Sequence, residues 1–375
     1  MSKVAQIKLQ FERFNRKGRE MEFRKKTVRD VEVAGKTVLV RVDYNVPIKD
    51  GKIVEDMRIR ASLPTLEYLI EQGAKKIVLI SHLGRPEGKP AMEFSLIPVA
   101  ERLGELLPGK TVQFASETTG AGVKVAVESL PDGGILMLEN LRFSPDEEAN
   151  SEEFAGKIIA DTGAELFVQD GFAVIHRAHA STDAIARKLP AVAGFLVEKE
   201  VSSLEGAMAN PQRPLLVIVG GAKVEDKQPL IDKFLPIADK IAVGDKIAAD
   251  GYQSMDEKVY VADKFVTDEN GAKLDIAPEC ADEIVAMINE SKTAIWNGTL
   301  GMVEDPRYAK ASRAIARALG THDCFSIVGG GDTTGFVESL AGENLEFGLV
   351  STGGGASLEL LSGKKLPGLE VLQDR

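Results

Sequence analysis

The sequence predicts an α/β protein with mostly parallel sheets, and three observations lead to that class. Short runs rich in β-branched residues alternate with helical patterns along the chain, as βαβ units require. The chain has 375 residues, more than the roughly 250–300 that one hydrophobic core serves, so two domains are expected. Its 44% hydrophobic and 27% charged residues are typical of a globular protein, and no apolar run reaches the roughly 18–20 residues of a membrane span.

The apolar β-branched runs predict the strands, and the amphipathic patterns between them predict the helices. Strands are expected at residues 38–42, 77–80, 135–138, 215–219, 240–243, 294–296, 325–328 and 347–350. Helices are expected at residues 63–72, 97–107, 151–162, 197–209, 281–290, 307–319 and 356–361. Residues 210–214 are the best domain boundary, because two prolines there stop the preceding helix just before a new strand.

The charge and cysteine content narrows the classes of function. A net charge of -11 argues against a general nucleic-acid binder and leaves a small anionic ligand on a local cationic patch. Two cysteines, Cys280 and Cys324, supply neither a disulfide framework nor a four-ligand zinc site, and there is no apolar signal segment, so a cytoplasmic protein is expected. Residues 1–20 are interpreted as a basic N-terminal extension; a nucleic-acid role for basic residues 1–30 is the less favoured alternative.

Glycine clusters in the second half of the chain predict phosphate binding. They are Gly220-Gly221, Gly329-Gly330-Gly331 and Gly353-Gly354-Gly355. Glycines at a strand-to-helix turn let backbone N–H groups approach a ligand, and the helix N-terminus favours an anion. Tight turns would explain one cluster well but three poorly. The carboxylate of Asp332 would repel phosphate unless Mg²⁺ intervenes, so it is either a metal contact or a helix cap.

The nucleotide fingerprints G-x-x-x-x-G-K-[ST] and G-x-G-x-x-G are both absent, so any nucleotide is held in another way. Lys223 and Lys227 follow a double glycine and are four residues apart, which would place them on one face of a helix. They could grip a phosphate chain together, although a lysine pair alone is usually a solvated face.

Histidines and arginines follow predicted strands in the first half. His82 and Arg85 follow one strand, Arg142 follows another, and a later loop contains His176-Arg177-Ala178-His179. Loops after the carboxyl ends of parallel strands bind ligands, and guanidinium and imidazole groups suit carboxylate and phosphate. A metal site at His176 and His179 would lack a third ligand. For each arginine alone a surface ion pair is the simpler interpretation, which only their convergence would overturn.

From about residue 21 to its end, the sequence resembles the phosphoglycerate kinase family. Ten segments carry the resemblance, in order and at nearly uniform spacing. They are residues 41–47 (Arg-Val-Asp-Tyr-Asn-Val-Pro), 58–59, 63–65, 81–86, 139–143, 176–179, 220–227, 296–298 (Trp-Asn-Gly), 329–333 and 351–359.

The resemblance implies two Rossmann-like three-layer domains with mostly parallel sheets, joined by a hinge helix. Residues 21–196 would bind 3-phosphoglycerate, 197–210 would form the hinge helix, 211–365 would bind the nucleotide, and 366–375 would return to the first domain. By the matching motifs, phosphoglycerate would be bound by Asp43, Asn45, Arg58, His82, Arg85, Arg142 and Arg177. ATP or ADP and Mg²⁺ would be bound by Lys223, Lys227, Asn297, Glu304, Gly329, Gly330, Gly331, Asp332, Thr333, Gly353, Gly354 and Gly355, with Asp332 as the metal contact.

The implied glycolytic reaction transfers a phosphoryl group reversibly between 1,3-bisphosphoglycerate and ADP. In the ATP-consuming direction the nucleophile is a carboxylate that is already ionised, so no general base is needed. The catalytic set expected from the resemblance is Arg58, Lys223, Gly330 and Gly354. Substrates on different domains imply a hinge closure that expels water before in-line transfer. We also expect a monomer with no nucleic-acid or membrane partner.

Several positions depart from the family pattern. Tyr44 replaces Phe, residues 169–173 read Gln-Asp-Gly-Phe-Ala, Thr299 replaces Pro, and Val303 replaces Phe. Residues 242–246 lack the usual Gly-Gly-x-Met segment near the adenine, and residues 251–264 are shortened, so an altered base preference is expected. The competing hypotheses are a related binding protein that has lost turnover and a different sugar- or acyl-phosphate kinase.

Overall fold

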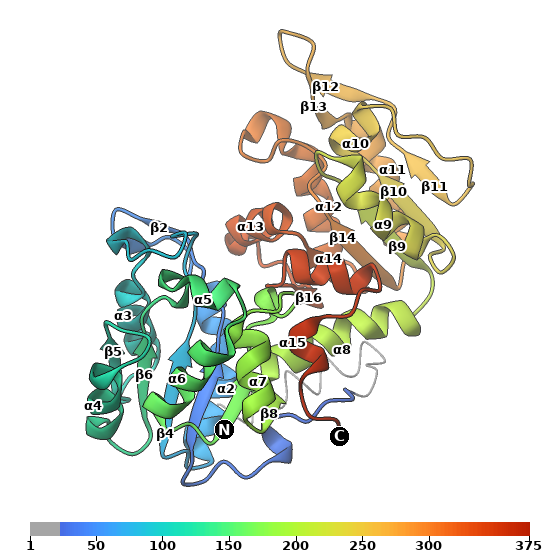
Figure 1. Cartoon of the computed structure of the whole chain (residues 1–375). Helices are drawn as coiled ribbons and strands as arrows, with labels where there is room; N and C mark the ends of the chain where they lie inside the picture. The colour runs from blue at the N-terminus through green and yellow to red at the C-terminus, as the bar shows by residue number, and fades with distance from the viewer. Residues whose placement is uncertain (1–22) are drawn as a thin grey trace. The chain divides into compact units, whose positions relative to one another are not determined.

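A computed structural model describes residues 23–375, which fall into two compact units (Figure 1). The first unit contains residues 23–199 and 365–375, and the second contains residues 200–364. The predicted extension at residues 1–20 lies outside the described residues. Within residues 23–375, no helix combines the length and the apolarity that crossing a bilayer requires.

The first unit is built on a six-stranded parallel sheet. Its order is β5-β6-β4-β1-β7-β8, with bounds β1 (Thr37–Arg41), β4 (Lys76–Ile80), β5 (Val112–Ala115), β6 (Gly134–Leu138), β7 (Leu166–Gln169) and β8 (Ala191–Ala193). Along β1, Val38 and Val40 belong to one core cluster, whereas Leu39 between them is equally buried on the other face. Because successive side chains of a strand point to opposite faces, the sheet is covered on both sides and forms the middle of three layers.

The helices of the first unit begin and end at recognisable signals. In α6 (Glu152–Thr162), the Ser151 side chain accepts a hydrogen bond from the N–H of Phe154, and Gly163 ends the helix with a left-handed φ of 63°. Helix α2 begins six residues earlier than predicted, which places Arg58 in its first turn and Pro64 inside the helix. The other elements are α2 (Met57–Glu71), α3 (Ile97–Leu106), α4 (Ala121–Ser129), α5 (Pro145–Glu148), α7 (Ile185–Lys188), the turns η1 (Val28–Asp30), η2 (Met92–Phe94), η3 (Leu141–Phe143), η4 (Phe172–Val174) and η5 (Ala180–Ala184), and the hairpin β2 (Ile48–Lys49) with β3 (Lys52–Ile53).

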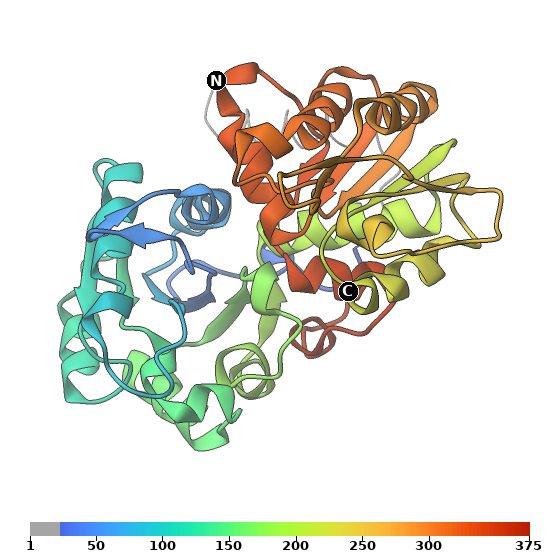
Figure 2. The same ribbon diagram turned by 90° about the horizontal axis from the view of Figure 1, so that it is seen from above.

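The second unit repeats the plan with the sheet order β11-β10-β9-β14-β15-β16, and Figure 2 shows helices on both sides of its strands. Its core surrounds Trp296, which is fully buried and donates its indole N–H to the carbonyl of Gly298 at 2.8 Å. The strands are β9 (Leu215–Val219), β10 (Lys240–Val243), β11 (Val259–Val261), β14 (Thr293–Asn297), β15 (Phe325–Gly329) and β16 (Leu349–Val350), beside the hairpin β12 (Phe265–Thr267) and β13 (Lys273–Ile276). The helices are α9 (Val224–Phe234), α10 (Asp245–Ala249), α11 (Pro278–Glu290), α12 (Lys310–Thr321), α13 (Gly331–Ser339) and α14 (Gly355–Leu361), with turns η6 (Pro306–Tyr308) and η7 (Ala341–Glu343).

Helix α8 (Phe195–Ala209) contributes its first residues to the first unit and the rest to the second. The predicted role of this helix as a hinge stays a prediction. The C-terminal segment with α15 (Pro367–Glu370) packs within the first unit. There the N–H of Gly368 donates to the carbonyl of Ile175 at 2.9 Å, and the N–H of Gln373 donates to that of Ala191 at 3.0 Å.

Asp170 makes the stability of the first unit depend on pH. It follows β7, is fully buried, and accepts a hydrogen bond from the N–H of Leu196 at 2.9 Å. Burial raises its pKa from 3.8 to about 7. The unfolded chain therefore releases this proton near pH 4 and the folded chain keeps it until near pH 7. The group's contribution to stability is complete below pH 4 and is lost as pH rises to 7, at about 1.4 kcal/mol per pH unit.

We therefore expect Asp170→Asn to flatten the fall in the free energy of unfolding between pH 4 and 7. Urea unfolding at half-unit pH steps measures that slope. Asp132→Asn, which changes an exposed carboxyl of the same unit, is the control and should leave the slope unchanged. Equal slopes in Asp170→Asn and the wild type would contradict the assignment.

Candidate active site

The predicted phosphoglycerate-binding residues lie at the carboxyl edge of the first sheet. Asp43 and Asn45 follow β1, and His82 and Arg85 follow β4. Arg142 lies in η3 after β6, and Arg177 follows η4 after β7. Since β6, β4, β1 and β7 are neighbours in one parallel sheet, these loops emerge side by side at one edge.

Asp43 lies beside the side chains of Arg58 and His82. One carboxylate oxygen pairs with Nη1 of Arg58, and the other lies 3.7 Å from Nδ1 of His82. The side chain of Asp43 is only 4% exposed, whereas that of Arg58 is 27% exposed. The carboxylate thus anchors one nitrogen of the Arg58 guanidinium. The other N–H groups of that guanidinium can reach a ligand.

Backbone groups of Gly84 tie two further site residues together. The side-chain oxygen of Asn45 accepts a hydrogen bond from the N–H of Gly84 at 2.9 Å, and Nη1 of Arg142 donates to the Gly84 carbonyl at 2.8 Å. Arg142 also pairs with Glu148 at 3.0 Å. The next residue, Arg85, is exposed and has no ion pair within residues 23–375. Asn45 and Arg142 are therefore held in place, whereas Arg85 stands free on its loop.

The arginines at this edge of the sheet lower the pKa values of the histidines beside them. Burial lowers the pKa of His82 well below 6.5, and the positive charges of Arg41, Arg142, Arg58 and Arg177 lower it further. Arg177 and Arg142 likewise weaken the protonated state of His179, whose pKa burial and neighbouring charges lower to about 4. The predicted arginines and histidines therefore lie close enough together to influence one another's charge, and the anion pocket stays a prediction.

Sequence reasoning did not assign a role to three buried residues beside this cluster of arginines and histidines. Arg41 ends β1 and is 1% exposed, and it contacts Ser181, which in turn contacts the fully buried Glu147. An arginine that ends an otherwise apolar strand was the available signal for Arg41. Ser181 and Glu147 carry no such signal, because only the fold brings residues 41, 147 and 181 together.

The predicted phosphate-binding residues of the second half gather at the carboxyl edge of the second sheet. A pocket of about 550 Å³ is formed there by the loops after β9, β14 and β15 and by the start of α14. The predicted residues that line it are Lys223, Lys227, Gly330, Gly331, Asp332, Thr333 and Gly355.

The other predicted nucleotide residues of this unit do not line the pocket. Asn297 is buried and accepts a hydrogen bond from Nζ of Lys227. Gly329 ends β15, and the N–H of Gly353 donates to Oγ of Ser351 at 3.1 Å. Gly354 precedes α14, and Glu304 lies close enough to the Asp245 carboxyl to raise its pKa. The N–H of Gly353 is thus already bonded to Ser351. Asn297 does not line the pocket itself but holds the ammonium group of Lys227, which does.

The two lysines do not share a helix face as predicted. Lys223 is the residue before α9 and has an extended backbone, so only Lys227 belongs to the helix. Both nevertheless line the pocket, where Lys223 is exposed and Lys227 is partly buried. Burial lowers the pKa of Lys227, while Asp226 and Asp332 act in the opposite direction. The pocket therefore holds one solvated ammonium group and one that is anchored.

Asp332 lies in the first turn of α13 and faces the same pocket. Within residues 23–375 no three His, Cys, Asp or Glu side chains are grouped closely enough to hold a metal ion by themselves. Mg²⁺ usually takes one or two protein carboxylates together with substrate phosphates and water. One carboxylate beside a pocket lined by two lysines fits that pattern of magnesium binding.

Gly298 lets the loops after β9 and β14 approach closely. A Cβ atom there would lie 2.1 Å from the Gly220 carbonyl oxygen, and the φ of +99° disfavours any side chain.

We expect Gly298→Ala to destabilise the chain by about 2–4 kcal/mol and to weaken nucleotide binding. Urea unfolding and ATP titration measure the two effects. Gly342→Ala, with open space around its Cβ, is the control, and equal stability of both variants would contradict the expectation.

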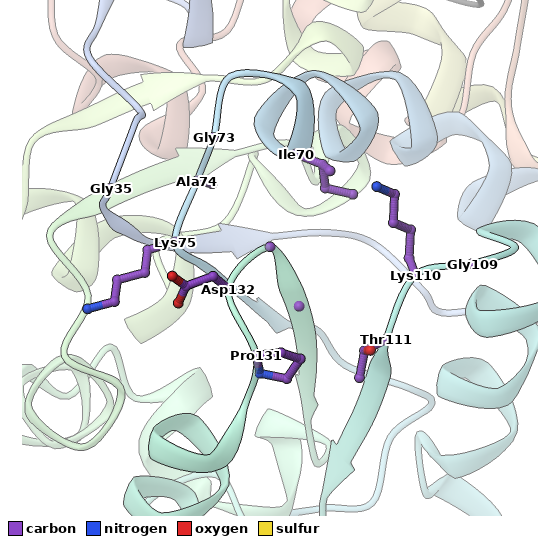
Figure 3. A pocket seen from close by; sticks show the side chains of 12 residues that line it. Gly35, Ile70, Gly73, Ala74, Lys75, Gly109, Lys110, Thr111, Pro131 and Asp132 are labelled. Carbon is purple, nitrogen blue, oxygen red and sulfur yellow. The ribbon is translucent and has the colours of Figure 1, made fainter.

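A second hollow of about 560 Å³ lies at the opposite edge of the first sheet (Figure 3). It is lined by residues just before β1, β4, β5 and β6, including Lys75, Lys110 and Asp132. None of the predicted site residues lines it. The carboxyl edge, where those residues gather, is therefore the candidate site.

Known proteins resemble this chain over most of its length. The phosphoglycerate kinase family profile matches residues 28–252 and 245–364. The phosphoglycerate kinase of Roseiflexus sp. is 42% identical over 396 aligned positions, covering 93% of this chain and 99% of that protein, and that of Chloroflexus aggregans is 44% identical over the same share. Both alignments are longer than the chain, so these relatives contain residues that it lacks.

Solved structures agree with the sequence relatives. The phosphoglycerate kinase of Pyrococcus horikoshii superposes with a TM-score of 0.82 at 28% identity, and that of Coxiella burnetii with 0.75 at 32% identity. Each comparison covers 92% of this chain and 98% of the other. With its α/β units, its family match and its relatives at 42–44% identity, the chain belongs to the phosphoglycerate kinase family.

Proposed function

We propose that the chain transfers a phosphoryl group reversibly between 1,3-bisphosphoglycerate and ADP, giving 3-phosphoglycerate and ATP. The observation that supports this most directly is the pair of sites at the carboxyl edges of the two sheets. One is a cluster of arginines and a histidine, and the other is a glycine-rich pocket with two lysines and a carboxylate. A small acid with one carboxylate and one phosphate suits the first, and a phosphate chain suits the second.

In the first unit, Arg58, Arg142 and Arg177 would bind the carboxylate and phosphate of phosphoglycerate, together with Asp43, Asn45, His82 and Arg85. Guanidinium groups offer paired donors that match both anions. The ion pair with Asp43 orients Arg58 before substrate arrives. Because these side chains are already held in place, less side-chain conformational entropy is lost when the substrate binds.

In the second unit, Lys223, Lys227 and the N-terminus of α13 would bind the phosphates of the nucleotide. The turn at Gly330, with φ of +93°, places backbone beside the pocket, and Thr333 Oγ1 accepts a hydrogen bond from the N–H of Gly298 at 2.9 Å. Asp332 would hold Mg²⁺ with the phosphate oxygens, and the ion when bound neutralises charge on the nucleotide.

Phosphoryl transfer requires these residues to align the two substrates and to stabilise the negative charge on the transferred group. The attacking carboxylate is ionised at neutral pH, so the proposal assigns no general base. We propose Arg58 and Lys223 as the cations that stabilise the transferred group, aided by backbone N–H groups at Gly330 and Gly354. Because each substrate is assigned to a different unit, we further propose a closure about α8 that excludes water. A cytoplasmic monomer remains part of this proposal.

A coupled assay with 3-phosphoglycerate, ATP and Mg²⁺ tests the proposal. ATP consumption should depend on all three components and should reverse when 1,3-bisphosphoglycerate and ADP are supplied. Binding of phosphoglycerate without turnover would instead favour the related binding protein, and turnover with other acids would favour a different acyl-phosphate kinase.

We also propose a relaxed preference for the nucleotide base. The family profile matches in two stretches that overlap at residues 245–252, and β10 passes directly into the five-residue helix α10 there. Asp245, which begins α10, accepts a hydrogen bond from the N–H of Gly221 at 3.0 Å. We expect kcat/KM for ATP, GTP and CTP to agree within about tenfold, or 1.4 kcal/mol. Strict dependence on ATP would contradict this.

A further inference from the structure

The guanidinium of Arg41 fixes which ring nitrogen of His82 can carry a proton. Its Nε donates to Oγ of Ser181 at 2.7 Å, its Nη1 donates to the carbonyl of Val42, and its Nη2 lies 3.2 Å from Nδ1 of His82. A guanidinium can only donate hydrogen bonds. In this contact Nδ1 must therefore accept, so it carries no hydrogen, and the proton of the neutral ring is on Nε2.

A competing arrangement is available to the same nitrogen. Oδ1 of Asp43 lies 3.7 Å from Nδ1 of His82, beyond hydrogen-bonding distance, and the other oxygen of that carboxylate pairs with Arg58. If Nδ1 carried a hydrogen, the imidazole ring would turn away from Arg41 so that Nδ1 could donate to Asp43. The position of Arg41 therefore decides between the two forms of the ring.

Ser181 and Glu147 hold Arg41 in that position. One oxygen of the Glu147 carboxylate accepts the hydroxyl proton of Ser181 at 2.5 Å, and the other accepts its backbone N–H at 3.0 Å. With its proton donated to Glu147, the hydroxyl oxygen of Ser181 is left to accept from Nε of Arg41. Glu147 and Ser181 are both fully buried, so neither can itself contact a ligand in this structure.

We propose that Glu147 and Ser181 are positioning residues that act through Arg41 to hold His82 as the neutral Nε2–H tautomer. In this form the ring offers Nε2 as a hydrogen-bond donor, which suits an anionic oxygen of phosphoglycerate. The other charges that act on the ring are Arg142, Arg58 and Arg177, which disfavour the imidazolium form, and Asp43, which would favour it. The inference rests on the proposed function for its substrate, but the tautomer is a property of the free protein.

Nitrogen-15 NMR of the histidine rings in the full chain tests this proposal. The chain has 4 histidines, so single His→Gln variants assign the signals. We expect His82 to show the Nε2–H pattern without change from pH 6 to 8. In Ser181→Ala, which breaks the link to Glu147, the ring should populate the Nδ1–H form. The KM for 3-phosphoglycerate should then rise about tenfold, with kcat changed less than threefold.

Two further variants make the test specific. Ser181→Thr keeps the hydroxyl and should restore both the tautomer and KM. Ser62→Ala removes another buried hydroxyl of the first unit, one that contacts the Tyr44 hydroxyl at 2.7 Å, and should leave the His82 signal unchanged. If Ser181→Ala fails to fold, Glu147→Met provides the same comparison, because it removes both oxygens that accept hydrogen bonds from Ser181.

An Nδ1–H or imidazolium pattern for His82 in the wild type would overturn the proposal. So would a folded Ser181→Ala or Glu147→Met variant with the wild-type tautomer and KM. Absence of turnover in the wild type would contradict the proposed function instead, and the spectrum of the free protein would still decide the tautomer.

Discussion

Replacing Arg58 by alanine should lower kcat for phosphoryl transfer by about 10²–10³-fold, with a smaller change in the KM for 3-phosphoglycerate. Arg58 is a partly exposed cation at the carboxyl edge of the first sheet, and the buried carboxylate of Asp43 pre-orients its guanidinium. A group held in this way costs little reorganisation when charge develops near it, so its contribution is expected to be larger in the transition state than in the ground state. Steady-state kinetics in the ATP-consuming direction measure both constants.

The chain offers a matched control for Arg58. Arg60 lies two residues further along α2, is exposed, and forms an ion pair with Asp56 at 2.7 Å. Arg60→Ala should change kcat by less than twofold. Arg58→Lys keeps the charge but loses the forked donors, so it should recover only part of the lost rate. A rise in KM with unchanged kcat in Arg58→Ala would show that this residue only binds substrate.

The sequence predicted the five-residue strands of the two sheets and missed most of the shorter ones. Strands β1, β4, β6, β9 and β14 are buried on both faces and therefore appear as continuous apolar runs. The edge strand β5 contains Gln113 and is only partly buried, and β8 has three residues, so neither produces such a run. Burial alone does not decide the outcome, because β7 and β8 are fully buried and were also missed, and both are shorter than the five-residue strands that were found.

The site was predictable to the extent that its residues follow strands. His82, Arg142 and Asp332 each come shortly after the end of a parallel strand. Topology then places His82 and Arg142 at the carboxyl edge of the first sheet and Asp332 at that of the second. The contacts of Arg41 with Ser181, and of Ser181 with Glu147, join residues more than 30 positions apart in the chain. No local pattern contains that information. The start of α2 was also misplaced, because the helix begins at Met57 and contains Pro64, whereas it was predicted to begin at Leu63.

Lys223→Ala should lower kcat by about 10²-fold or more while changing the KM for ATP only a few-fold. Lys223 is exposed at the mouth of the phosphate pocket, and within residues 23–375 its ammonium group has neither a hydrogen bond nor an ion pair. Lys227, in contrast, is anchored to Asn297. A charge without a partner in the free protein can follow the phosphoryl group as it moves, whereas an anchored charge stabilises the bound nucleotide in a fixed position.

The comparison of the two lysines separates these roles. Lys227→Ala removes a contact made before the reaction begins and should raise the KM for ATP more than Lys223→Ala does. Lys233→Ala, at the far end of α9 and outside the pocket, should leave both constants unchanged. Because the pKa of Lys227 is lowered by burial, its loss should also weaken ATP binding less at high pH, where part of the wild-type population is already neutral. If Lys223→Ala raised KM and spared kcat, Lys223 would belong with Lys227 to ground-state binding, and Arg58 would be the main cation of the transition state.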